Sequence, residues 1–312
     1  AAMVAAIALA ASLQGYWLRA AGRLAVLGVV CSLAGQGQYT APIHAPFSVA
    51  LLQGNVPQHL KFDPQVSQSH MLNYARMAAA SSAALTVLPE TALPTVLERV
   101  APEVQALLRT NPGTVVIGNL GWQPAQGGVQ YTNRLASPFA ATPWQYDKAH
   151  LVPFGEAIPA GFQWFVDWMQ MPLSSLAAGG HEQAPLRVGS VLIAANICYE
   201  ELFAHEWRNR AATAHVLLNA SNFGWYGRST ALPQHSNIAR MRALEFQKPY
   251  LSATNNGTTL AVLPDGTVQA QLAPHVQGVL QFTVQGRQGE TPYARWGDWG
   301  VVVAAALVGV LS

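Results

Sequence analysis

The chain of 312 residues is long enough to bury a full hydrophobic core in one large domain or two ordinary ones. Charged residues make up 10% of it, against about 25% in an ordinary soluble domain, and its mean hydropathy is positive, which favours a membrane protein. The net charge of +2 has no basic run behind it, so nucleic acid is not expected as a partner. Cys31 and Cys198 lie in segments of very different character, and no structural disulfide is expected between them.

Apolar segments occupy both ends of the chain. Residues 1–13 and 24–34 are almost entirely apolar, and the aromatic and basic residues between them are typical of a membrane interface. Because an apolar run precedes the arginines, this start fits a sequence that begins inside a membrane domain better than a signal peptide. Residues 300–311 are again wholly apolar. We therefore expect residues 1–40 to end an N-terminal membrane domain and residues 296–312 to begin a C-terminal transmembrane helix.

The body of the chain, residues 45–290, alternates strand patterns with helix patterns, which predicts a single layered α/β domain closed by a hairpin. If Arg19 and Arg23 face the cytoplasm, the second apolar run delivers this body to the other side of the membrane. The expected strands are 47–52, 85–88, 114–119, 188–197, 216–219, 250–253, 259–263 and 268–272, and the expected helices are 64–80, 103–109, 202–212 and 233–246.

Cys198 is the first candidate for chemistry. It ends the apolar strand pattern of residues 188–197 and precedes a helix pattern, so it lies at a strand-to-helix corner. Such a corner holds a side chain on rigid elements, and the first free N–H groups of the helix favour a thiolate there. The pattern is typical of a nucleophile, although an unpaired Cys is often a small core residue.

Two further segments carry candidate partners for that thiol. Glu90 follows an apolar strand pattern, at the strand edge where α/β sheets gather their sites, and a carboxylate there is suited to general-base duty. Lys148 also follows a strand pattern and could pair with a carboxylate and donate to an oxyanion, with Glu156 orienting it. Taken singly, Glu90 could equally be an exposed loop acid, and a lone Lys is usually a solvated surface charge.

Read together, these segments resemble the Glu-Lys-Cys signatures of the nitrilase, or carbon-nitrogen hydrolase, superfamily. More narrowly, the chain resembles the apolipoprotein N-acyltransferases, the membrane enzymes that complete bacterial lipoproteins. The resemblance covers residues 51–299. The segments that carry it are 52–58, 88–90, 146–156, 196–200, 219–227, 234–245, 253–257 and 291–293.

The resemblance implies a four-layer αββα nitrilase-like sandwich at residues 45–290, flanked by transmembrane helices of which this sequence holds the last few. It implies a multi-pass protein of the bacterial inner membrane, with the catalytic domain on the periplasmic face. The implied reaction moves a fatty acyl chain from a phospholipid of the phosphatidylethanolamine type, through a thioester on Cys198, to the N-terminal amine of a diacylglyceryl-cysteine apolipoprotein. The alternative is a nitrilase-like amidase that hydrolyses a carbon-nitrogen bond. A monomer without cofactor is expected.

The resemblance also assigns roles to individual residues. Glu90, Lys148 and Cys198 are the implied catalytic triad. The backbone N–H of Tyr199 would help Lys148 to stabilise the oxyanion. Glu156 and Glu200 are implied as further polar members of the site.

A third group of residues is expected to contact the lipid. Phe62 stands where the family commonly has Trp, which keeps the aromatic face and loses the indole donor. The aromatic stretch 153–171 is interpreted as an arm over the site, with an ordinary core helix as the alternative. We expect substrate binding by Phe62, Phe154, Trp164, Trp168, Trp225 and Tyr226. No pattern of His, Cys, Asp and Glu has metal-ligand spacing, so no metal is expected.

Overall fold

The structure is a computed structural model that describes residues 35–61, 63–125, 128–158, 176–300 and 302–303, with shorter pieces at 6, 21–23, 25–26, 28–29 and 32. The expected membrane segments, 1–40 and 296–312, therefore fall largely outside the described residues. Among the helices that are described, none combines the length and the apolar character needed to cross a bilayer.

Strands from the first half of the body, together with β14 near its end, build a seven-stranded sheet in the order β14-β2-β3-β5-β6-β7, with β4 beside β5. The central strands β2, β3 and β5 run parallel, and they are buried because helices cover one face and a second sheet covers the other. The strands are β2 Phe47–Gln53, β3 Leu85–Val87, β4 Leu93–Val96, β5 Thr114–Ala125, β6 Gly128–Ser137, β7 Trp144–Asp147 and β14 Gly278–Val284. The helices of this half are α3 Gln58–Lys61, α4 Pro64–Ala79 and α5 Pro102–Arg109, with the 3-10 turn η1 at Leu97–Arg99.

The second half builds a six-stranded sheet in the order β13-β12-β11-β10-β9-β8. Its central strands β9, β10 and β11 are parallel, and β11, β12 and β13 close it as an antiparallel meander. The strands are β8 Leu186–Val188, β9 Val191–Ile197, β10 Val216–Ser221, β11 Tyr250–Thr254, β12 Leu260–Val262 and β13 Val268–Gln271. The helical elements are the 3-10 turn η2 Cys198–Leu202, α7 Ala204–Thr213, α8 Ala231–Phe246 and α9 Pro292–Trp296.

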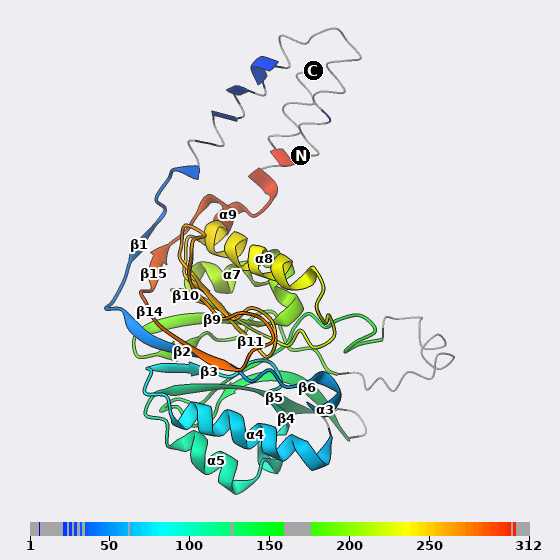
Figure 1. Cartoon of the computed structure of the whole chain (residues 1–312). Helices are drawn as coiled ribbons and strands as arrows, with labels where there is room; N and C mark the ends of the chain where they lie inside the picture. The colour runs from blue at the N-terminus through cyan, green and yellow to red at the C-terminus, as the bar shows by residue number, and fades with distance from the viewer. Residues whose placement is uncertain are drawn as a thin grey trace.

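The two sheets pack face to face, and the helices form the outer layers (Figure 1). One buried cluster joins side chains of both sheets, such as Val87 and Leu218. A second cluster packs α4 and α5 on the first sheet, and a third packs α7 and α8 on the second. The predicted four-layer αββα sandwich is therefore confirmed. A short ribbon, β1 Thr40–Pro42 with β15 Arg287–Gly289, pairs the two ends of the body.

The structure corrects two predicted boundaries. The strand expected over residues 188–197 is two strands, because Gly189 adopts a φ of +57° in the two-residue turn between β8 and β9. The helix expected from residue 202 starts at Ala204, because residues 198–202 form the 3-10 turn instead. Strands β4, β6, β7 and β14 were not predicted as elements, although the pattern before Lys148 was read as a strand.

Trp207 tests the packing of the outer layer on the second sheet. Its side chain is 2% exposed, and its ring lies 5.5 Å from that of Phe246 on α8. Trp207→Ala should lower the free energy of unfolding by about 3–5 kcal/mol, because it leaves a cavity between two helices. The measurement is chemical denaturation of the purified chain followed by circular dichroism. The matched control is Trp225→Ala: Trp225 is 78% exposed, and its loss should change stability by less than about 0.5 kcal/mol. Equal effects of both changes would contradict this packing.

Candidate active site

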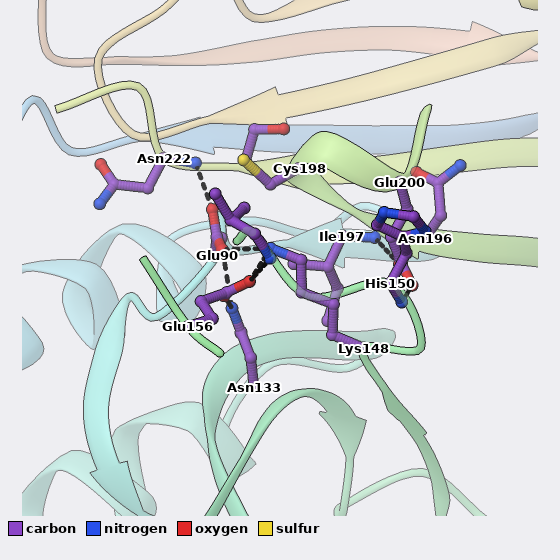
Figure 2. Close-up of polar contacts among 12 residues, drawn as sticks. Glu90, Asn133, Lys148, His150, Glu156, Asn196, Ile197, Cys198, Glu200 and Asn222 are labelled. Atoms are coloured by element: carbon purple, nitrogen blue, oxygen red, sulfur yellow. Dashed lines mark hydrogen bonds and ion pairs between the residues drawn. The ribbon is translucent and has the colours of Figure 1, made fainter. Parts of the chain in front are cut away.

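A buried lysine between two carboxylates forms the centre of the site. Lys148 is fully buried directly after β7, and its Nζ lies 2.8 Å from Glu156 Oε2 and 3.6 Å from Glu90 Oε1. Figure 2 shows Glu90, Lys148 and Glu156 converging, with Cys198 above Glu90. Burial alone would lower the pKa of Lys148, but Glu90, Cys198 and Glu156 together raise it well above its usual value. Lys148 is therefore a fixed positive charge inside the site.

Both carboxylate oxygens of Glu90 accept hydrogen bonds. It lies in the turn after β3 and is 7% exposed. Its Oε1 accepts a hydrogen bond from Asn133 Nδ2 at 2.7 Å, and its Oε2 accepts one from the backbone N–H of Asn222 at 2.7 Å. Gly118 on β5 permits this turn to pack closely, since a Cβ there would lie 2.0 Å from the carbonyl oxygen of Pro89. These contacts leave the carboxylate little freedom to rotate.

Asn133 links the two carboxylates to each other. Its Nδ2 donates to Glu156 Oε1 at 2.8 Å as well as to Glu90. The other oxygen of Glu156 accepts the backbone N–H of Val152, which fixes the loop after Lys148. Glu156 thus contacts Lys148 directly, and Asn133 donates to both carboxylates. The orienting role expected of Glu156 stays a prediction.

Cys198 is placed at the predicted corner after β9 and is 8% exposed. Its φ of +53° is in the left-handed region, a conformation that costs a non-glycine residue about 1–3 kcal/mol. Burial and the nearby Glu90 raise the pKa of the thiol, while Lys148 and the Asn222 backbone N–H act in the opposite direction. The resting state is therefore the thiol, whereas the helix-end argument favoured a thiolate, because desolvation outweighs the local dipoles here.

Glu200 stabilises the strand-to-helix corner at Cys198 by accepting backbone hydrogen bonds. Its Oε2 accepts the backbone N–H of Ile197 at 2.6 Å, and its Oε1 accepts those of Ala149 and His150 at 2.6 and 3.0 Å. It also accepts the hydroxyl of Tyr146 at 2.9 Å. One carboxylate thus ties the strand before Cys198 to the loop after Lys148, so Glu200 sets the distance between them.

Tyr199 packs beside the site rather than within this network. Its ring lies 5.0 Å from that of Phe203 and 5.6 Å from that of His150, and its side chain is half-buried. The aromatic group of Tyr199, Phe203 and His150 forms a wall next to the nucleophile.

The residues expected to contact substrate are only partly described. Phe62, Trp164 and Trp168 lie outside the described residues, as does most of the expected arm at 153–171. Phe154 is half-buried in the loop that carries Glu156. Trp225 and Tyr226 are 78% and 40% exposed on the loop after β10. Burial is the main cause of the raised pKa of Tyr226, and its ring lies 6.1 Å from that of Phe223.

Sequence reasoning missed Asn133, Lys61 and the role of the Asn222 backbone. Asn133 gave no signal because β6 was not recognised as a strand. Lys61 was not singled out, yet it is 4% exposed and its Nζ donates to the main-chain oxygen of Glu90 at 3.0 Å. The residues that the structure describes contain no group of three or more His, Cys, Asp or Glu side chains that could hold a metal ion.

Comparisons with known proteins show the family to which the chain belongs. The Carbon-nitrogen hydrolase family matches residues 48–293, and the chain belongs to that family. A relative from Ralstonia nicotianae, named apolipoprotein N-acyltransferase, is 42% identical over 97% of this chain and 61% of its own length. A second with the same name, from Chromobacterium violaceum, is 36% identical over 88% of this chain and 54% of its own. The chain thus spans a little over half the length of these relatives.

Solved structures share the fold at low sequence identity. A CN-hydrolase superfamily protein from Xanthomonas campestris matches 84% of this chain and 97% of its own, with a TM-score of 0.54 and 19% identity. An amidase from Nesterenkonia sp. matches 84% of this chain and 97% of its own, with a TM-score of 0.55 and 20% identity. Both are similar in fold alone.

Asn133 provides a test of the buried charge balance. Asn133→Asp replaces the donor shared by Glu90 and Glu156 with a third anion, so we expect a loss of about 2–3 kcal/mol of stability. The added anion also disfavours the thiolate, so alkylation of Cys198 by iodoacetamide should slow about tenfold. Mass spectrometry of the Cys198 peptide measures that rate, and chemical denaturation measures the stability.

Asn209→Asp is the matched control for that change. Asn209 Nδ2 also donates to a carboxylate, that of Glu182, but Asn209 is exposed on α7. Water screens the new charge there, so both the alkylation rate and the stability should stay close to those of the unchanged chain. A similar loss in both variants, or in neither, would contradict the role assigned to the buried amide.

Proposed function

We propose that this chain transfers a fatty acyl group from a membrane phospholipid, through a thioester on Cys198, to the N-terminal amine of a diacylglyceryl-cysteine apolipoprotein. The observation that carries the proposal is the buried cluster of Glu90, Lys148 and Cys198. The proposal is also supported by sequence similarity, since a relative named apolipoprotein N-acyltransferase is 42% identical to this chain. The proposed donor is of the phosphatidylethanolamine type.

In the first step, Glu90 takes the thiol proton as Cys198 attacks the acyl carbonyl of the donor. Because the thiol pKa is raised, the proton moves when the substrate is in place, and no free thiolate accumulates beforehand. Lys148, with the backbone N–H of Tyr199, stabilises the tetrahedral oxyanion. The carbon–oxygen bond to glycerol then breaks, Glu90 returns its proton to the leaving oxygen, and a lysophospholipid departs from the thioester.

In the second step, the incoming ammonium of the lipoprotein loses a proton to Glu90 and attacks the thioester carbonyl. The same two donors stabilise the second oxyanion. The carbon–sulfur bond breaks, the thiolate recovers a proton from Glu90, and a second proton leaves to solvent. The thioester divides the conversion of an ester to an amide into two lower barriers, which suits a polarisable sulfur nucleophile.

The location belongs to the same proposal. The apolar segments 1–40 and 296–312 would anchor a multi-pass protein in the bacterial inner membrane, with residues 45–290 on its periplasmic face. The exposed Trp225 and Tyr226 would meet the lipid, together with Phe62, Phe154, Trp164 and Trp168. We propose that the enzyme acts as a monomer. An amidase would use the same cluster with water as the acceptor, and the exposed aromatic loop favours a lipid substrate over that alternative.

A product assay tests the proposal. Full-length protein is incubated with phosphatidylethanolamine and a synthetic diacylglyceryl-cysteine peptide, and the mass of the peptide is measured by mass spectrometry. We expect a third acyl chain on its amine. Cys198→Ser should abolish the product, and Glu90→Gln should slow it by about 10²–10⁴, since it keeps the size and loses the base. Release of free fatty acid without peptide acylation would instead identify a hydrolase.

A further inference from the structure

The chain contains three lysines, and all three are buried. Lys61, Lys148 and Lys248 are 4%, 0% and 1% exposed. Lysine is almost never fully buried unless its charge has a partner. Lys148 has two carboxylates, but the mechanism above gives no role to Lys61 or Lys248.

Lys61 lies against the proposed base. It is the last residue of α3, and its Nζ donates to the main-chain oxygen of Glu90 at 3.0 Å. The same short helix reaches the other side of Glu90, because Gln58 Oε1 accepts a hydrogen bond from Asn222 Nδ2 at 2.7 Å. Asn222 in turn donates its backbone N–H to Glu90 Oε2. Helix α3 therefore contacts both the Glu90 turn and Asn222, one of the donors to the Glu90 carboxylate.

The charge of Lys61 also acts on the reacting groups. Burial lowers the pKa of Lys61 to about 8, and Glu90 and Cys198 act in the opposite direction. The charged groups that act on it are thus Glu90, from the turn after β3, and Cys198, from the end of β9. An ammonium in this position favours the state in which the sulfur carries negative charge. Because its pKa is lowered, it loses this charge as the pH rises through about 8.

We propose that Lys61 is a positioning residue of the active centre, whose ammonium clamps the Glu90 turn and adds a second positive charge that favours the Cys198 thiolate. This inference rests on the roles given to Glu90 and Cys198 in the proposed function. It separates the two lysines of the site: Lys148 contacts the carboxylates directly and supplies the oxyanion donor, whereas Lys61 acts through the main chain and the field around Glu90.

Lys248 is a matched comparison. Its pKa is also lowered to about 8 by burial, and its Nζ donates to the main-chain oxygens of Ala211 and Ala212 at 2.8 and 2.5 Å. It follows the end of α8, its ammonium reaches α7, and it has no contact with Glu90 or Cys198 among those the structure describes. A purely structural buried lysine should behave like Lys248.

The test measures alkylation of Cys198 by iodoacetamide from pH 6 to pH 10, which needs neither lipid nor acceptor. For the unchanged full-length chain, we expect the plot of alkylation rate against pH to bend downward near pH 8, where Lys61 loses its proton. Lys61→Met should lower the rate about tenfold below that pH and remove the bend. Lys61→Arg keeps the charge at every pH used, so it should also remove the bend while retaining most of the rate. Lys248→Met should keep the bend.

Thermal denaturation of each variant shows that the comparison uses folded protein. If Lys61→Met does not fold, Lys61→Arg decides the matter alone. A bend that persists in Lys61→Arg, or a folded Lys61→Met with the unchanged rate and profile, would overturn the proposal. If the unchanged chain transfers no acyl group but the alkylation profiles are as expected, the proposed function is overturned and the role of Lys61 stands.

Discussion

The structure depends on one buried ion cluster, in which the ammonium of Lys148 lies between the carboxylates of Glu156 and Glu90. Taking three charges out of water is costly, and attraction between them offsets that cost only when further hydrogen bonds satisfy the remaining polar atoms. Asn133 and the Asn222 backbone supply those bonds. These hydrogen bonds keep the cluster charged at the sheet edge, where the two face-to-face sheets exclude water.

The sandwich gives each charged group a rigid support. Glu90 follows β3 and Lys148 follows β7 in the first sheet, whereas Cys198 follows β9 and Asn222 follows β10 in the second. The active centre is thus shared between the layers, and Glu200 links them by accepting backbone N–H groups from both the Lys148 loop and the Cys198 strand. A shift of one sheet against the other would separate the base from the nucleophile.

Much of this arrangement was predictable from sequence, because apolar runs mark buried parallel strands and the strand ends of an α/β sheet gather functional side chains. Those two rules located Glu90, Lys148 and Cys198, although their catalytic roles stay predictions. Asn133 was not predictable, since it lies inside β6, whose partly exposed residues give no clear period. Lys61 was missed because burial of a lysine follows from tertiary packing and leaves no mark on the local sequence. The raised pKa of the thiol was not predictable for the same reason: the effect of the helix-end N–H groups is local, whereas desolvation depends on the whole fold.

In the proposed mechanism, Cys198 takes up an acyl group from a phospholipid before any acceptor arrives. Intact-protein mass spectrometry of the full-length chain, incubated with phosphatidylethanolamine alone, tests it most directly. We expect one added fatty-acyl mass, located on Cys198 and removed by neutral hydroxylamine, as a thioester requires. A chain that stays at its unmodified mass in the presence of the lipid, while its thiol still reacts with iodoacetamide, would contradict this mechanism.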